Sequence, residues 1–164
     1  MLDLQDVRDA RPRVAETSRH TPLDHSHTFS AMTGADVHLK LETFQRTGAF
    51  KIRGATNRIA TLSEAQREAG VVTASAGNHA QGVALAASRA GVDALVVMPE
   101  DAPISKVEAT RHYGAAVELH GVDYDAAAER AHEIEGAEDR YYLHAFDDEQ
   151  VMAGQGTIGL EILD

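Results

Sequence analysis

The sequence predicts an open parallel α/β sheet with helices on both faces. First, from residue 70 onward, short runs rich in β-branched residues alternate with helical patterns, at about 20 residues per pair. Second, a glycine closes each of three helical patterns, at Gly91, Gly114 and Gly136. Third, 164 residues with 43% hydrophobic side chains suffice for one buried core.

The first part of the chain, residues 1–66, is expected to hold helices and short extended segments. A helix is predicted in residues 1–20, interrupted at Pro12 because proline lacks the N–H that a helix uses. Residues 21–23 and 36–42 read as extended. A second helix is predicted from the apolar side chains that share one face: Phe50, Ile52, Ala55, Ile59 and Leu62.

A short helix is expected next, between a capping Ser63 and a terminating Gly70. The alternation that follows predicts strands at 70–75, 93–100, 115–121 and 140–146, and helices at 78–91, 105–114, 124–136 and 147–163. In such sheets, ligands bind beyond the carboxyl ends of the strands, near the N-termini of the following helices.

Composition excludes several classes of function. The net charge of -11 argues against a nucleic-acid partner, which needs a basic surface. No cysteine is present, so disulfides and thiolate chemistry are excluded. The N-terminus lacks a signal-peptide core, and the apolar runs are too short for a membrane. We therefore expect a cytoplasmic protein, with an acidic surface of the kind that suits a high-salt organism.

One lysine stands out in a chain that avoids lysine. Lysines account for only three of the 15 Lys and Arg residues, at Lys40, Lys51 and Lys106. Lys51 lies in the stretch "TGAFKIRGA", where its amine could be tuned to a neutral nucleophile, which an arginine could not become. The alternative is an ordinary lysine in the first turn of an amphipathic helix.

The loop after the first sheet strand, "SAGNHAQG" at Ser75 to Gly82, is a candidate anion site. Ser75 and Asn78 offer short polar side chains, and Gly77 lets the backbone approach a ligand. The free amides and positive dipole end of the following helix favour a carboxylate or phosphate. The alternative is a serine or asparagine cap in a tight strand-to-helix turn.

Together, "ETFQRTGAFKIRGA" (42–55) and "SAGNHAQG" closely resemble the fold-type-II pyridoxal-phosphate enzymes, and more narrowly the threonine dehydratase and serine racemase branch. The segments "TPL" at 21–23 and "LKLE" at 39–42 also match segments of that branch. The resemblance covers nearly the whole chain and implies a tryptophan-synthase-β-like fold.

The resemblance also implies roles for individual residues. Lys51 matches the lysine that forms the Schiff base with pyridoxal 5'-phosphate and removes the α-proton of the substrate. Phe50 matches the residue beside the cofactor ring, and Asn78 matches the side chain that binds the ring hydroxyl. The residues that match the substrate-carboxylate loop are Ser75, Gly77, Asn78 and His79.

The implied reaction is dehydration and deamination of L-threonine or L-serine to a 2-oxo acid and ammonia, which links the chain to isoleucine biosynthesis. Serine racemases tend to carry a second serine at the position of Ala76, where alanine cannot transfer a proton. The alternatives are a serine racemase, a hydroxyaspartate dehydratase, a cysteine-synthase-like enzyme, or a non-catalytic piece that binds a partner.

The resemblance further implies a division of the chain. Residues 67–146 would form a small α/β domain, while 1–66 and 147–164 would belong to a larger domain of a homo-oligomeric enzyme. The family's glycine-rich phosphate loop matches nothing before Asp164. We therefore expect a truncated, N-terminal portion that is inactive alone.

Two further motifs are discounted. The stretch "GQGTIG" at 154–159 has the spacing of a dinucleotide-binding loop but lies inside a helical pattern. His25 and His27 lack further ligands nearby in the sequence, so a polar loop is expected there and no metal site is predicted.

Overall fold

A four-stranded parallel sheet forms the centre of the protein. The computed structural model describes residues 1–164, and its strands lie in the order β5-β4-β3-β6. Their bounds are β3 Val71–Ala74, β4 Ala94–Met98, β5 Ala116–Leu119 and β6 Tyr141–Tyr142. All three strand pairs are parallel, which confirms the predicted fold class.

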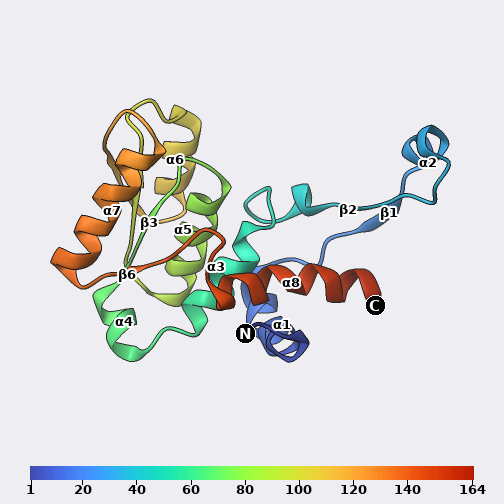
Figure 1. Ribbon diagram of the computed structural model, residues 1–164, viewed down its shortest axis with the longest axis horizontal. Helices are drawn as coiled ribbons and strands as arrows, with labels where there is room; N and C mark the ends of the chain where they lie inside the picture. Colours follow the sequence, from blue (N-terminus) through green and yellow to red (C-terminus); the bar gives the residue numbers. More distant parts are fainter.

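Helices cover both faces of this sheet (Figure 1). Helices α5 (Asn78–Ala90) and α6 (Ile104–His112) lie on one face, and α7 (Tyr124–Glu138) lies on the other. Successive strand residues point to opposite faces, so Val71 packs into the α5 core while Val72 packs into the α7 core. Because both of its faces are covered, the central strand β3 is buried at every residue, whereas the edge strand β5 is partly exposed and carries Glu118.

A second group of helices packs beside the sheet: α1 (Leu4–Thr17), α3 (Lys51–Ala60) and α8 (Glu149–Leu163). Helix α3 packs against α5 as well as against α8, so it joins this group to the sheet. The short helices η1 (Glu42–Phe44) and α4 (Glu64–Ala69) flank α3 in the sequence. The division of the chain at residues 66 and 147 stays a prediction.

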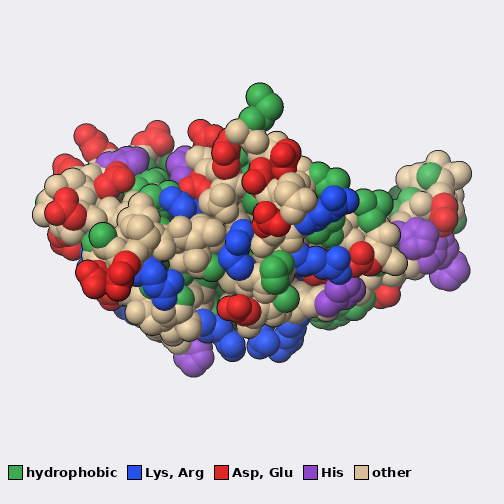
Figure 2. Space-filling view, turned by 90° about the horizontal axis from the view of Figure 1, so that it is seen from below, with side chains coloured by type: hydrophobic (Ala, Val, Ile, Leu, Met, Phe, Trp, Pro, Cys, Tyr) green, Lys and Arg blue, Asp and Glu red, His purple; other side chains and the backbone are tan.

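An arm projects from the helical group, at the right of Figure 1. Its strands, β1 (Leu23–His25) and β2 (His38–Lys40), pair antiparallel, and α2 (His27–Thr33) forms its tip. Figure 2 shows histidine side chains gathered on this arm. Helix α2 was not expected, because the sequence there reads as a polar loop.

Three predicted boundaries were wrong. Helix α1 continues through Pro12, because one missing hydrogen bond is offset by the capping box at Asp3 and the buried Ala10 and Val14. Helix α7 passes through the predicted end at Gly136 and ends at Asp139, which adopts a left-handed conformation with φ 55. Strand β6 has two residues rather than the predicted 140–146.

The "GQGTIG" stretch lies within α8 and serves helix packing. A Cβ at Gly154 would lie 2.7 Å from the Cα of Gly54 in α3, and one at Gly156 would lie 2.9 Å from the side chain of Val7 in α1. These glycines let three helices approach closely. The rejection of a dinucleotide loop is consistent with this placement. None of the helices has the length and apolar character needed to cross a membrane.

Candidate active site

The candidate residues gather where α3 and α5 begin. Strand β3 ends at Ala74, and the loop at Ser75–Gly77 leads directly into α5. Lys51 is the first residue of α3, whose backbone touches the first turns of α5. The structure therefore brings the two sequence motifs together beyond the carboxyl end of a central strand, as ligand sites in parallel sheets require.

The Lys51 amine is partly buried and held by one backbone group. Its Nζ donates a hydrogen bond to the carbonyl oxygen of Ala145 at 2.8 Å, and it lies 5.4 Å from the centre of the Phe50 ring. Burial lowers the pKa of the Lys51 amine, because the charged form loses solvation. A lowered pKa increases the neutral, nucleophilic fraction near neutral pH.

The Ser75–Gly77 loop presents free amides. The Ser75 hydroxyl oxygen accepts hydrogen bonds from the backbone N–H groups of Gly77 and Ala80, both at 3.2 Å. No group in the chain accepts from the N–H of Asn78 or His79. A Cβ at Gly77 would meet open space. Ser75 thus caps part of the turn, while the remaining amides stay available to an anion at the N-terminus of α5.

The Asn78 side chain is exposed at the start of α5. Its Oδ1 accepts a hydrogen bond from Nζ of Lys106 in α6, at 3.4 Å. This long contact between two exposed groups leaves the amide nitrogen of Asn78 free. The side chain can therefore turn toward a ligand in the adjacent loop.

The His79 imidazole faces the sheet rather than solvent. The residue is 4% exposed, and its Nε2 lies 3.2 Å from the carbonyl oxygen of Leu143. Burial lowers the pKa of His79 to about 4, so the ring is neutral near neutral pH. The backbone N–H of His79 has no acceptor within the chain. The proposed roles of Lys51, Phe50, Ser75, Gly77, Asn78 and His79 stay predictions.

A buried ion network fixes the start of α3 and was missed by the sequence reasoning. Arg53 is fully buried and donates to both oxygens of Glu42, at 2.9 and 2.8 Å, and to both oxygens of Glu161, at 2.6 and 2.9 Å. Lys40 pairs with Glu161 at 2.6 Å. The network ties α3, two residues after Lys51, to α8 and the base of the arm.

Gly82 is a second residue whose role in the site the sequence did not reveal. A Cβ there would lie 3.0 Å from the carbonyl carbon of Lys51 and 3.1 Å from the nitrogen of Ile52. The absence of a side chain therefore sets how closely α5 approaches the first turn of α3. A glycine inside an otherwise helical pattern was the available signal.

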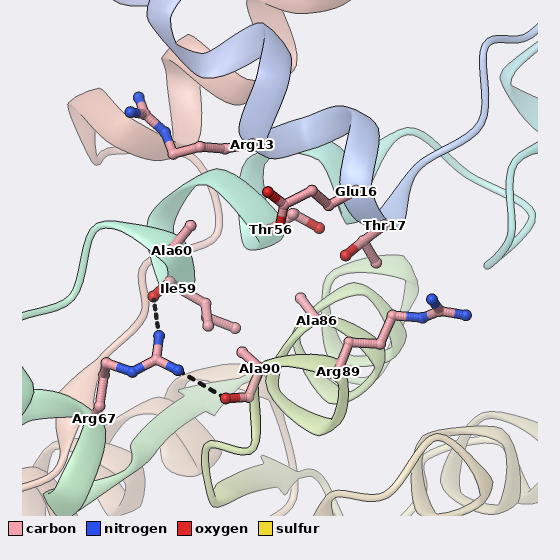
Figure 3. Close-up of a pocket in the computed structure, with 10 residues that line it drawn as sticks. All are labelled: Arg13, Glu16, Thr17, Thr56, Ile59, Ala60, Arg67, Ala86, Arg89 and Ala90. Carbon is pink, nitrogen blue, oxygen red and sulfur yellow. Dashed lines mark hydrogen bonds between the residues drawn. The ribbon is translucent and has the colours of Figure 1, made fainter.

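The pocket in Figure 3, of about 370 Å³, lies elsewhere. It sits where α3 and α5 end, away from their N-termini. Arg67 donates to the carbonyls of Ile59 at 3.4 Å and Ala90 at 2.7 Å, which closes both helix ends. Figure 3 shows the guanidinium groups of Arg13 and Arg89 directed away from the centre of the pocket. We therefore interpret the pocket as a junction between two helix ends that Arg67 caps.

The arm brings together histidines that the sequence separates. The ring of His25 lies 4.5 Å from that of His27 and 5.2 Å from that of His38. Nε2 of His25 lies 3.1 Å from a carboxylate oxygen of Asp36. No group of three or more His, Cys, Asp or Glu side chains in the protein is arranged to hold a metal ion.

Comparison with known proteins agrees with this geometry. The chain is 49% identical over 164 residues to L-threonine ammonia-lyase of Thermotoga maritima, covering 100% of this chain and 41% of that protein. It is 45% identical over 161 residues to the catabolic L-threonine dehydratase TdcB of Escherichia coli K12, covering 98% of this chain and 49% of that protein. The chain thus spans about half the length of the curated relatives that it matches.

A solved structure shows the same fold. Maize serine racemase superposes with a TM-score of 0.94 at 38% identity, over 99% of this chain and 49% of that one. A family model described as "Pyridoxal-phosphate dependent enzyme" matches residues 14–164. The chain therefore belongs to the family of pyridoxal-phosphate dependent enzymes.

Proposed function

We propose that the protein eliminates water from L-threonine, and from L-serine, to give a 2-oxo acid and ammonia. The observation that carries the proposal is the Lys51 amine, whose pKa is lowered by burial and whose charge acts on His79, the second residue of α5. An amine in that position can exchange protons with an amino acid whose carboxylate binds the α5 amides. The names of the Thermotoga maritima and Escherichia coli relatives both contain L-threonine, which supports threonine as the substrate.

The residues present fit one side of a pyridoxal phosphate molecule. Lys51 offers a primary amine for the aldehyde, Phe50 offers a ring that is 39% exposed, and Asn78 offers a free side-chain amide for the ring hydroxyl. Gly77 leaves open space where a side chain would block the approach. The chemistry that this cofactor supplies when bound is withdrawal of electrons from the α-carbon of the amino acid.

The groups of this chain then have separate tasks. The N–H groups of Asn78 and His79, with the hydroxyl of Ser75, bind the substrate carboxylate and orient the α-carbon. Lys51 Nζ takes the α-proton, because its lowered pKa keeps part of the amine neutral. The β-hydroxyl takes up a proton and leaves as water, and the enamine that remains then takes up water to give the 2-oxo acid and ammonia.

Racemisation is the second candidate, supported by the likeness to maize serine racemase. A racemase needs a proton donor on the face opposite the lysine, and Ala76 stands in the Ser75–Gly77 loop without one. Elimination is therefore favoured. With L-serine as substrate, the complete enzyme should form pyruvate and little D-serine, and Ala76→Ser should increase the share of D-serine.

Three further aspects belong to this proposal. The substrate is a small amino acid, the enzyme works in the cytoplasm, and its complete form is a homo-oligomer. The negative net charge supports the absence of a nucleic-acid partner. The name of the E. coli relative contains the word catabolic. It therefore supports a catabolic role rather than a role in isoleucine biosynthesis.

Reductive labelling tests the proposal. The complete enzyme is incubated with pyridoxal phosphate, reduced with borohydride, digested and mapped by mass spectrometry. The label should appear on Lys51 and be lost in Lys51→Arg, which keeps the positive charge but has no primary amine. Ammonia release from L-threonine, measured on the complete enzyme, should vanish in the same variant. A label confined to Lys40 or Lys106 would overturn the assignment.

A further inference from the structure

The backbone of Leu143 is held from three sides. Its N–H donates to the carbonyl of Val72 at 2.8 Å, which continues the pairing of β6 with β3. Its carbonyl accepts from the hydroxyl of Thr73 at 2.8 Å and lies 3.2 Å from Nε2 of His79. Thr73, His79 and Leu143 are all buried. The peptide group of Leu143 therefore has one well-defined orientation.

The segment that follows Leu143 leads to the lysine. Two residues later, the carbonyl of Ala145 accepts the hydrogen bond from Lys51 Nζ at 2.8 Å. Between them, Nδ1 of His144 accepts from the N–H groups of Phe146 at 3.2 Å and Asp147 at 2.7 Å, which closes a tight turn. A hydrogen bond to the carbonyl of Leu143 thus influences where the carbonyl of Ala145 lies.

We propose that His79 is a positioning residue for Lys51. It holds the carbonyl of Leu143, so that the turn at 143–147 places the carbonyl of Ala145 against the Lys51 amine. This role rests on the proposed function of Lys51, and it differs from binding the substrate through the His79 side chain. Thr73 shares the task, because its hydroxyl donates to the same oxygen.

The electrostatic setting suits such a role. As a neutral ring that donates through Nε2–H, His79 keeps one tautomer, and its buried Nδ1 has no partner. Burial, with smaller contributions from the charges of Lys51 and His144, keeps the pKa of His79 at about 4. The donor to Leu143 is therefore present over the whole range in which Lys51 titrates.

Positioning and simple packing predict opposite results when the donor is removed. If His79 only fills space, an apolar side chain of similar size leaves Lys51 equally buried, and its pKa stays low or falls further. If His79 orients the turn, its loss frees the carbonyl of Ala145 and lets water reach the amine. The pKa of Lys51 then rises toward its ordinary value.

The experiment measures the reactivity of the amine without cofactor or substrate. The protein is acetylated briefly with acetic anhydride over a series of pH values, and the acetylated fraction of each lysine is quantified by mass spectrometry. Lys106, which is partly exposed on α6, serves as an internal reference. The variants are His79→Leu, Thr73→Val and His79→Gln, the last of which keeps a donor near the position of Nε2.

The midpoint for Lys51 should rise by about half a pH unit or more in His79→Leu and Thr73→Val, while that of Lys106 stays fixed. His79→Gln should keep a midpoint near that of the unmodified protein. An unchanged or lower midpoint in the folded His79→Leu protein would overturn the positioning role and leave the proposed function standing. If His79→Leu does not fold, Thr73→Val decides by the same criterion.

Discussion

Gly82 of α5 and Lys51 of α3 are in backbone contact, because a Cβ on residue 82 would lie 3.0 Å from the carbonyl carbon of Lys51. Gly82→Ala should therefore push the two helices apart. We expect a loss of about 1–3 kcal/mol in the free energy of unfolding, measured by urea denaturation. The amine of Lys51 should also become more exposed.

Gly136 provides the matched control, since it lies inside α7 and a Cβ there meets nothing within 4 Å. Gly136→Ala should raise the free energy of unfolding by about 0.5–1 kcal/mol, because alanine loses less backbone entropy in a helix. Equal effects of the two substitutions would show that the contact with Lys51 does not limit the packing.

Arg53→Met should be among the most destabilising single changes in this chain. It removes the guanidinium that donates to Glu42 and Glu161, and it leaves both carboxylates largely buried. Glu161 keeps Lys40 and His20 nearby, while Glu42 keeps the hydroxyl of Thr21. Breaking a buried ion pair from one side costs about 3–5 kcal/mol. Arg11→Met, which breaks an exposed pair with Asp164, should change the stability by less than about 1 kcal/mol.

The free energy of unfolding should depend on pH through the ionisation of Glu161. Burial opposes ionisation of this carboxyl, but hydrogen bonds from Arg53 and Lys40 outweigh it and lower the pKa of Glu161 to about 2 from its ordinary 4.5. The carboxylate therefore stabilises the fold above about 4.5, and this contribution is lost as the pH falls toward 2.

Glu161→Gln isolates that contribution. The variant should be less stable than the unmodified protein near neutral pH, and the difference should shrink steadily as the pH falls below 4.5. Denaturation by urea at several pH values measures both curves. A difference that stays constant down to pH 2 would mean that the ionised carboxylate contributes nothing to stability.

Arg67 should contribute more to the stability of the fold than Arg89, which borders the same pocket in Figure 3. Arg67→Met removes donors from the carbonyls of Ile59 and Ala90 at two helix ends, with an expected loss of roughly 1–3 kcal/mol. Arg89 borders the same pocket without a hydrogen bond, so Arg89→Met should stay within about 0.5 kcal/mol of the unmodified protein. Thermal unfolding followed by circular dichroism compares the two.

The parallel sheet could be predicted because its strands are short apolar runs separated by helical patterns of the right length. Helix α2 could not, since its seven residues show no clear helical period and the helix depends on the Ser26 cap and a left-handed Gly34. The helix interruption predicted at Pro12 was wrong, because the capping and burial that stabilise α1 are spread over the rest of the helix.

In the site, Lys51 and the segment Ser75–Gly82 could be predicted because their residue types are typical of catalytic and ligand-binding groups. The carbonyl of Ala145 could not, because every residue carries one and only the path of the chain places it near Lys51. The burial of His79 depends in the same way on Leu143, which lies 64 positions later in the sequence. Long-range backbone contacts of this kind leave no local pattern.

The hydrogen bonds between Arg53 and Glu161 join residues that are 108 positions apart. Closing so long a loop costs more chain entropy than pairing strands that follow one another through a single helix. We therefore expect the sheet to form early in folding and α8 to dock late. In the folded protein, α8 should also be the segment whose transient release first exposes its amides to hydrogen exchange.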